Sequence, residues 1–367
     1  MKSEWQQAKD TQGVLLQTHI GGQALLEGIM MRGRYNWAIA VRRPDGTIYT
    51  EEHDLVSGRP RNSWMYWPVI RGCTALVESF ALSYQALQVS SENAFMGLEE
   101  SDAADEGDAG TSPQGITASD ESGETEAIFS IAVEDDDDDG NLPKPLITAT
   151  LILGMLLGMG IFVALPALLT NLLVGDYGQR TLLWNLVDGA IRIVIFVLYI
   201  WLIGRMPDIK RVFGYHGAEH KTIHCYEHGR ELLPENADVF PTLHVRCGTA
   251  FMLMTMLIAI LVFTLVPIGL VIESLHVTNP ILRFLIVLAS RIVLIPLVAG
   301  LAYEVTVKWA GSHPENRLVQ FVLWPGMQLQ RLTTNQPDVG QLECAIAAMQ
   351  LVLAREIRET EATQASS

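Results

Sequence analysis

Four long apolar runs constrain this chain more than any other feature. They cover Leu146–Val174, Leu182–Ile203, Gly248–Ile272 and Ile281–Tyr303. Each run is long enough to cross a bilayer, and a single segment in hydrocarbon satisfies its backbone hydrogen bonds only as a helix. The connections at 175–181 and 273–280 are short. The sequence therefore predicts four transmembrane helices arranged as two hairpins.

The positions of lysine and arginine predict the orientation of these helices. Between residues 204 and 247 there are six: Arg205, Lys210, Arg211, Lys221, Arg230 and Arg246. The two short connections hold one, Arg180. Because cytoplasmic loops are enriched in these residues, we expect 204–247 and both termini to face the cytoplasm. The sequence thus predicts a multi-pass protein of the cytoplasmic membrane, in which Cys225 and Cys247 remain thiols or metal ligands rather than a disulfide.

The net charge of −16 comes from one segment. Residues 99–139 contain 16 Asp and Glu without Lys or Arg, and the rest of the chain balances 25 acidic with 25 basic residues. This composition predicts a disordered acidic linker over 99–141. Since no basic patch is present, a nucleic-acid partner is not expected. The lipid bilayer is the predicted partner, and the sequence specifies no protein partner.

Residues 1–98 divide into two predicted units. A small β unit covers Val14–Leu55, where Pro44-Asp45-Gly46 marks a hairpin turn. Trp64–Phe95 has apolar residues at helical spacing with polar interruptions. We expect a helix there that lies on the membrane or re-enters it.

After the fourth apolar run, the chain is expected to return to the cytoplasm as residues 304–367. Gln336–Thr360 is predicted to be an amphipathic helix whose apolar face contains Leu342, Ile346, Met349 and Leu353. The predicted order is the N-terminal unit, the linker, helices over 142–203, a loop over 204–247, helices over 248–303 and the C-terminal segment. The predicted fold class is a mainly α membrane protein with a small N-terminal β unit and cytoplasmic helical segments.

The loop at 204–247 holds five of the nine histidines. His216-Gly-Ala-Glu219-His220 and His224-Cys-Tyr-Glu-His228 both have the pattern H-x-x-E-H. Histidines four apart lie on one face of a helix, so His216 and His220 can bind the same ion. This is the arrangement of inverted zincins, in which the adjacent carboxylate acts as base. We therefore predict a divalent transition metal, zinc by preference, with Glu219 as the catalytic residue.

The remaining ligand of the predicted site is left open by the sequence. Candidates for it are His224, His244, Cys247 and Glu304, and Glu27 and Glu78 of the N-terminal unit are also possible. The doubled motif also allows two metal ions, or a choice of register among the histidine pairs. A solvated helix and a purely structural metal site are the alternatives. Because Gly217 weakens a helix, the helix is expected to start just after His216.

Two further groups of polar residues are candidate sites. The glycine-rich segment Gly21–Gly33 carries Glu27 and Arg32, which either contact a ligand or form an ion pair beside a tight turn; Glu78 is a third polar candidate. Within the apolar runs, Asp188 and Arg192 are spaced to pair, and Arg291 lies in the fourth run. Charges in a bilayer usually face the interior of a helix bundle. They indicate either a function or a structural cluster.

Four segments resemble the YqhQ-like family of bacterial membrane proteins. These are Gly21–Gly33, Tyr215–Thr222, His244–Thr249 and Pro325–Thr334. The resemblance covers nearly the whole chain except the acidic linker. The family is of unknown function and is commonly described as predicted metal-dependent enzymes. The resemblance implies a membrane protein and a metal, and it implies no substrate.

These observations favour a metal-dependent hydrolase acting at the cytoplasmic membrane surface. Two other functions remain open at this point. One is a scaffold or binding protein with a structural metal site, and the other is a metal transporter or sensor. In a scaffold, a transporter or a sensor, Glu219 would have no catalytic role.

Overall fold

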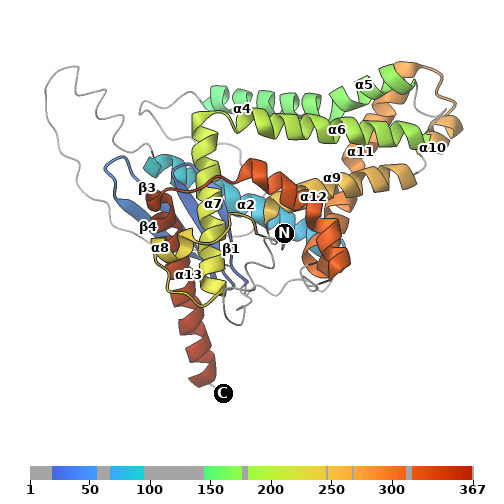
Figure 1. The fold of residues 1–367 in the computed structure, drawn as a ribbon. Coiled ribbons are helices and arrows are strands. Elements are labelled where there is room, and N and C mark those ends of the chain that lie inside the picture. The colour runs from blue at the N-terminus through green and yellow to red at the C-terminus, as the bar shows by residue number, and fades with distance from the viewer. Residues whose placement is uncertain are drawn as a thin grey trace, which may run out of the picture.

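The computed structural model of the chain describes residues 19–55, 67–94, 144–175, 181–244, 247–266, 268–310 and 316–365. It contains long apolar helices and a compact unit built on a small sheet (Figure 1). The acidic linker predicted at 99–141 lies outside the described residues, as do residues 14–18 of the predicted β unit.

The sheet is antiparallel and has the order β1-β2-β3-β4. Its strands are β1 Gly21–Leu25, β2 Gly28–Arg32, β3 Asn36–Arg42 and β4 Ile48–Asp54. The turn between β3 and β4 contains the predicted Pro44-Asp45-Gly46. The Asp45 carboxylate accepts a hydrogen bond from the Thr47 backbone N–H at 2.8 Å, and Gly46 adopts φ +85°. The predicted β unit is therefore confirmed over its described part.

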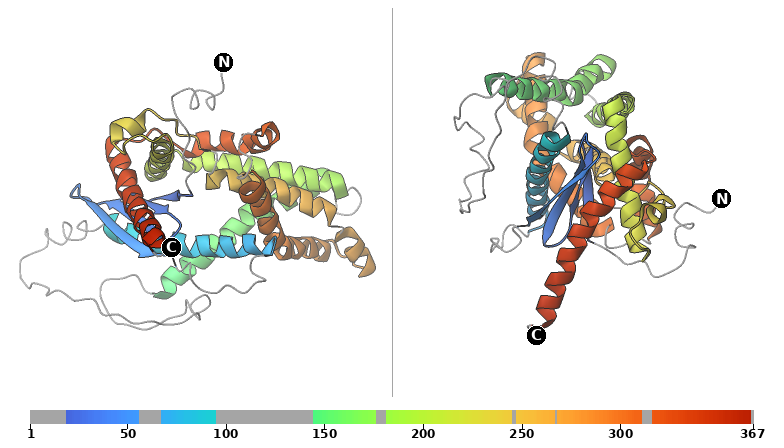
Figure 2. Two further views of the ribbon diagram at one scale, coloured as in Figure 1. Left: turned by 90° about the horizontal axis from the view of Figure 1, so that it is seen from below. Right: turned by 90° about the vertical axis from the view of Figure 1, so that its left-hand side faces the viewer.

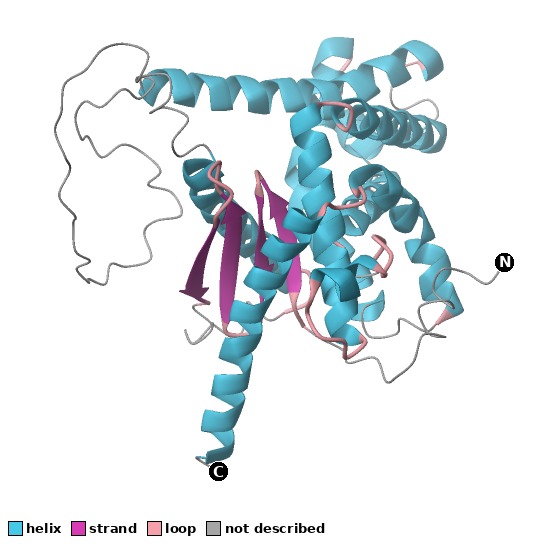
Figure 3. Cartoon of the chain, turned by 60° about the vertical axis from the view of Figure 1, so that its left-hand side comes forward, coloured by secondary structure: helices cyan, strands magenta, loops and turns pink. Residues whose placement is uncertain are grey.

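Helices cover both faces of the sheet. Side chains alternate along β3, so Ala38 and Ala40 face one side while Trp37 and Ile39 face the other. The first side packs against α7 (Pro207–Glu227) and α13 (Val339–Ala365), and the second packs against α2 (Ile70–Ala94), as the right-hand view of Figure 2 and Figure 3 show. Because both faces are covered, β3 is buried along nearly its whole length.

Among the described residues, four stretches of helix are long and apolar enough to cross a membrane, which confirms the prediction. They are Ile152–Val174, Leu182–Ile203, Phe251–Ser274 and Pro280–Trp309. These stretches consist of α-helices and two short π-helical segments, labelled η. They are α4 Lys144–Met159, η2 Gly160–Ala164, α5 Leu165–Val174, α6 Thr181–Ile203, α9 Gly248–Leu265, α10 Ile268–Ser274, α11 Pro280–Tyr303 and η3 Glu304–Ala310. Leu172, Leu265 and Val293 are largely exposed, as expected for side chains that face lipid. The chain is a membrane protein, and its orientation remains a prediction.

The predicted charged cluster within the apolar helices forms. The Asp188 carboxylate on α6 accepts hydrogen bonds from Arg192 at 3.2 Å and from Arg291 of α11 at 2.5 Å. The Arg291 guanidinium lies 4.9 Å from the ring centroids of both Trp184 and Phe263. Burying a charge among helices is costly unless it is paired, and here the pairing joins α6 to α11.

α2 connects the sheet to the apolar helices. Near its start, Gly72 lies against Tyr303 and Gly300 of α11, and Arg71 forms an ion pair with Glu304. Its later turns cover the sheet through Ala86 and neighbouring residues. The predicted helix over this segment is confirmed in residues 70–94. Whether it lies on or within the bilayer remains a prediction.

α7 (Pro207–Glu227) carries the histidine motif and follows α6 after three residues. The prediction that this helix begins just after His216 is wrong. Pro207 occupies its first turn, where proline is favoured, and Asp208 follows it. Gly217 therefore lies inside the helix. A Cβ there would collide with the Asn335 carbonyl oxygen, so the glycine permits close packing rather than starting the helix.

Three further helices complete the unit around α7. They are α8 (Pro234–Asp238), α12 (Arg317–Thr333) and α13 (Val339–Ala365). The Asp338 carboxylate accepts a hydrogen bond from the Gln341 backbone N–H at 2.8 Å at the start of α13. The predicted apolar face is buried at Leu342, Ile346 and Met349, which confirms the predicted amphipathic helix. α12 packs against α9 and ends at Thr333, beside the histidines of α7.

Candidate metal centre

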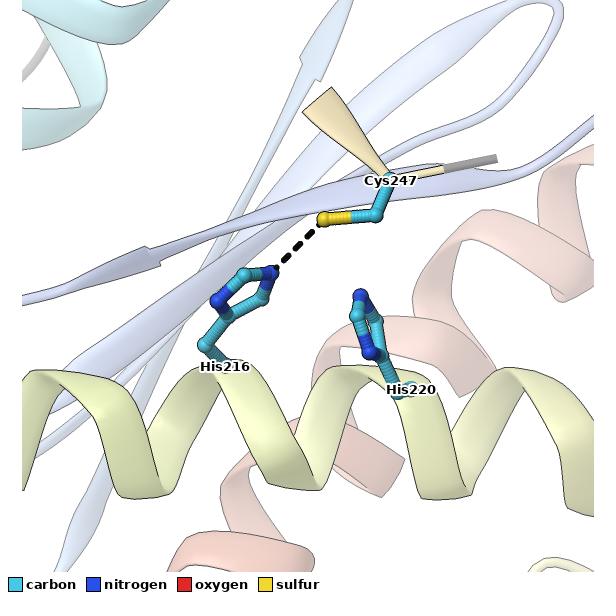
Figure 4. A group of neighbouring side chains, drawn as sticks. All are labelled: His216, His220 and Cys247. Carbon is cyan, nitrogen blue, oxygen red and sulfur yellow. Dashed lines mark hydrogen bonds between the residues drawn. The ribbon is translucent and has the colours of Figure 1, made fainter. Parts of the chain in front are cut away.

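Three of the predicted ligands come together on one face of α7. His216 and His220 are one turn apart, and the loop before α9 brings Cys247 above them (Figure 4). One ligand atom from each residue lies within 4.8 Å of the other two. The His216 Nε2 atom is 3.0 Å from the Cys247 Sγ atom. These three residues form what we call the His–Cys group.

Hydrogen bonds to the backbone fix both imidazole rings. The His216 Nδ1 atom lies 2.8 Å from the Thr333 carbonyl oxygen, and the His220 Nδ1 atom lies 2.5 Å from the Thr242 carbonyl oxygen. A carbonyl only accepts, so each Nδ1 must carry the proton, and each neutral ring then presents a lone pair at Nε2. Metal-binding histidines typically have this second hydrogen bond.

The Nε2 atom of His220 is buried and has no hydrogen-bond partner among the described residues. Burial lowers the pKa of His220 to about 4, against an opposing effect of the neighbouring Cys247. The ring is therefore neutral near pH 7, as a metal ligand must be. A buried polar atom without a partner is unfavourable, and a metal ion at this position would satisfy it.

Glu219 is buried beside the His–Cys group but is not one of its members. Its carboxylate accepts a hydrogen bond from the Gly22 backbone N–H at 2.9 Å, which joins α7 to β1. A Cβ on Gly22 would lie 3.0 Å from the Glu219 Cδ atom, so the glycine allows this approach. Burial raises the pKa of Glu219 to about 7, with a smaller opposing contribution from His216.

Two more predicted ligands lie in a second group, His224 on α7 and His244 in the segment after α8. His224, Glu227 and His244 also place one ligand atom each within 4.8 Å of one another. His244 and Glu227 are buried, and the pKa of His244 is lowered to about 4 by that burial. We call these residues the His–Glu group. Glu227 is not among the predicted ligands, although it is the glutamate of the second H-x-x-E-H copy.

Glu304 is placed away from both groups. Its carboxylate forms an ion pair with Arg71 and accepts a hydrogen bond from the Val69 backbone N–H at 3.3 Å. α11 thus ends in a contact with α2. The structure does not bring Glu304 to the histidines, because α2 supplies its partner.

The three polar candidates of the N-terminal unit form two separate ion pairs. Glu27, in the tight turn between β1 and β2 with φ +48°, pairs with Arg211 of α7. Arg32 lies 3.9 Å from Glu78 of α2. The anticipated pairing of Glu27 with Arg32 does not occur, because the two residues have partners on opposite sides of the sheet. Their contacts join the sheet to its covering helices.

Several residues that shape the site carry no ligand chemistry and were not anticipated. The side-chain amide of Gln330 accepts from the His244 backbone N–H at 2.9 Å and donates to the His244 carbonyl at 2.8 Å. The Thr333 carbonyl orients His216. Both contributions come from α12, and nothing in the local sequence signals contacts across 86 residues for Gln330 and 117 residues for Thr333.

Comparison with known proteins agrees with the family resemblance. A family described as "Protein of unknown function (DUF1385)" matches residues 67–355. The chain belongs to the DUF1385 family. It is 30% identical over 337 residues to "Uncharacterized protein YqhQ" of Bacillus subtilis (strain 168), covering 92% of each chain. No solved structure matches the chain. Membership of DUF1385 therefore identifies the family and assigns no reaction to the chain.

Proposed function

We propose that this protein is a metal-dependent membrane enzyme of the hydrolase class, whose centre is the His–Cys group with Glu219 beside it. One observation supports this proposal above the others. Two Nε2 atoms and one thiol converge within 4.8 Å, while both opposite ring nitrogens are engaged by carbonyl oxygens. Packing alone does not require this combination.

The donor atoms favour zinc among the divalent transition metals. Imidazole nitrogen and thiolate sulfur are both common zinc ligands, whereas Mg²⁺ and Ca²⁺ prefer oxygen. His216, His220 and Cys247 would hold the ion. A zinc ion bound by three protein ligands acts as a Lewis acid at its open position.

Glu219 is suited to move a proton in such a reaction. A general acid–base group works best when its pKa is near the working pH, and burial raises the pKa of this carboxyl to about 7. The Gly22 N–H engages one carboxylate oxygen at 2.9 Å and so fixes its direction. Glu219 would take a proton from the attacking water and later return it to the leaving group.

The position of α7 supports a substrate at the membrane surface. The helix starts three residues after α6 leaves the apolar region, so its histidines lie close to the end of a membrane span. We propose that the substrate is a peptide or a lipid-linked molecule at the membrane surface. With the predicted orientation, this is the cytoplasmic surface.

A non-catalytic scaffold with a structural metal site is the second candidate function. The burial of His220, Cys247 and Glu219 favours it, because structural sites are closed whereas catalytic sites keep an open position. The two functions share the ligands and differ in access to the ion. They are therefore distinguished by whether a small external ligand reaches the bound metal.

Metal content is the first experiment. Protein purified in detergent should contain zinc by elemental analysis, and the double variant His216→Ala/His220→Ala should lose the ion bound by the His–Cys group. His276→Asn is the matched control, since His276 lies in the exposed connection before α11 and belongs to neither ligand group. Metal-free wild-type protein, or unchanged content in the double variant, would overturn the proposal.

Access is the second experiment. Cobalt replaces zinc with little change in geometry and makes the site visible by absorption. An enzyme should show altered cobalt bands on addition of azide or a hydroxamate, and Glu219→Gln should retain cobalt while the pH dependence of those bands changes. Cobalt absorption bands that do not change on addition of either anion would favour the scaffold.

A further inference from the structure

The His–Glu group lies one turn further along α7 and is not used by the proposed centre. We infer that His224, Glu227 and His244 form a second binding site for a divalent transition metal ion, beside the first. This inference is independent of whether the first centre is catalytic. It concerns the number of ions that the chain holds.

Geometry supports the site directly. The three ligand atoms lie within 4.8 Å of one another, and the His244 Nε2 atom is 3.4 Å from the Glu227 Oε2 atom. The two helix residues are three apart, so they project from the same side of α7. The loop after α8 supplies His244 from above, as it supplies Cys247 to the first group.

The surrounding contacts orient the ligands. The His224 Nε2 atom lies 2.9 Å from the Leu243 carbonyl oxygen, so Nε2 carries the proton and Nδ1 presents the lone pair. The backbone of His244 is held at both its N–H and its carbonyl by the buried Gln330 amide. Such outer hydrogen bonds are a regular feature of metal-binding histidines.

Burial distinguishes this group from a solvated patch of polar residues. Glu227 is 6% exposed and His244 is 4% exposed. Taking a carboxylate out of water is unfavourable unless it is paired or coordinates a cation. A buried carboxylate beside two imidazoles is a ligand set that suits a divalent ion, in addition to the His244 contact that Glu227 already makes.

The two groups form one continuous row. Ring centroids are 4.5 Å apart for His216 and His220, 5.7 Å for His220 and His244, and 4.7 Å for His244 and His224. His220 and His244 are thus neighbours that belong to different groups. The doubled H-x-x-E-H motif sets the spacing along α7, and His244, which lies outside that helix, places its ring beside both His220 and His224.

The donor sets differ in a way that an experiment can use. The first set contains a thiolate and the second contains a carboxylate. Two histidines with one glutamate is an established zinc ligand set, so both groups suit the same metal. Only the first would give a sulfur-to-cobalt charge-transfer band, whereas both would give cobalt d–d bands.

Cobalt titration of the metal-free, full-length protein in detergent tests the inference. Wild-type protein should bind two equivalents. Glu227→Gln should lose one equivalent and keep the charge-transfer band. Cys247→Ser should also lose one equivalent, and the charge-transfer band should disappear with it. His228→Ala is the matched control, since His228 lies next along the stripe but outside both groups, and it should keep two equivalents.

The outcomes separate this inference from the proposed function. One equivalent in wild type, unaffected by Glu227→Gln and lost with Cys247→Ser, would overturn the second site and leave the first. No bound cobalt would overturn both. If Glu227→Gln does not fold, His224→Gln provides the same test, and thermal unfolding of each variant shows whether the fold is intact. Removing a ligand should weaken the second site by more than the roughly 10–100-fold seen for loss of an outer hydrogen bond.

Discussion

Replacing Gly217 with alanine should destabilise this protein, although local preference predicts the opposite. In a helix interior, alanine is favoured over glycine by about 1 kcal/mol. The new Cβ, however, would collide with the Asn335 carbonyl oxygen. That carbonyl cannot retreat easily, because the Asn335 N–H donates to the Phe213 carbonyl at 2.8 Å and its side chain donates to the Lys210 carbonyl at 3.1 Å.

Overpacking of this kind costs about 1–3 kcal/mol, and backbone atoms relax less readily than side-chain ends. We therefore expect the upper part of that range and, after subtracting the helix preference, a net loss of about 1–2 kcal/mol. Metal affinity should also fall about 10–100-fold, because the Thr333 carbonyl that orients His216 lies two residues before Asn335.

Thermal unfolding in detergent, followed by tryptophan fluorescence, measures the first effect, and zinc titration measures the second. Gly158→Ala in α4 is the control. No atom lies within 4 Å of the Cβ that this substitution would add, so this variant should be as stable as wild type or more so. The reasoning is refuted if Gly217→Ala unfolds at or above the wild-type temperature with unchanged zinc affinity.

Three further predictions test other parts of the structure. Glu304→Ala should leave metal content unchanged, and a lost ion would restore Glu304 as a ligand. Burial raises the pKa of Cys225 and of Cys344 to about 11 from the ordinary 9.0. Alkylation of both thiols at pH 8 should therefore be about 100-fold slower in the folded protein than in the unfolded one, from the smaller thiolate fraction alone. Rapid labelling of the folded protein would contradict their burial. Gln330→Ala should leave two buried backbone groups of His244 without their partner and destabilise the fold by about 2–4 kcal/mol. The ion of the His–Glu group should be released before that of the His–Cys group. An unchanged unfolding temperature would contradict this contact.

The four spans and the amphipathic C-terminal helix were predictable because each depends on residues close in the sequence. Runs such as Leu182–Ile203 need only length and hydropathy to be recognised. The helix over 339–365 shows its apolar face at regular spacing. The sequence also places His216 and His220 on one face, since a single helical turn relates them.

Long-range contacts account for what the sequence could not provide. The start of α7 was misplaced because the reason for Gly217 is a carbonyl more than one hundred residues away. Among the candidates for the remaining ligand, only the fold shows that Cys247 lies with His216 and that Glu304 pairs with Arg71. Glu227 could have been anticipated from the symmetry of the doubled motif, but the loop that brings His244 to it could not.

The ligand environment of bound zinc tests the central claim most directly. X-ray absorption at the zinc edge, measured on protein loaded with one equivalent, should show one sulfur at about 2.3 Å together with imidazole nitrogen at about 2.0 Å, since the His–Cys group provides both. Cys247→Ser should remove the sulfur signal and keep that of imidazole. A zinc ion surrounded only by nitrogen and oxygen in the wild-type protein, or a protein that binds no zinc, would contradict the claim that His216, His220 and Cys247 form a metal centre.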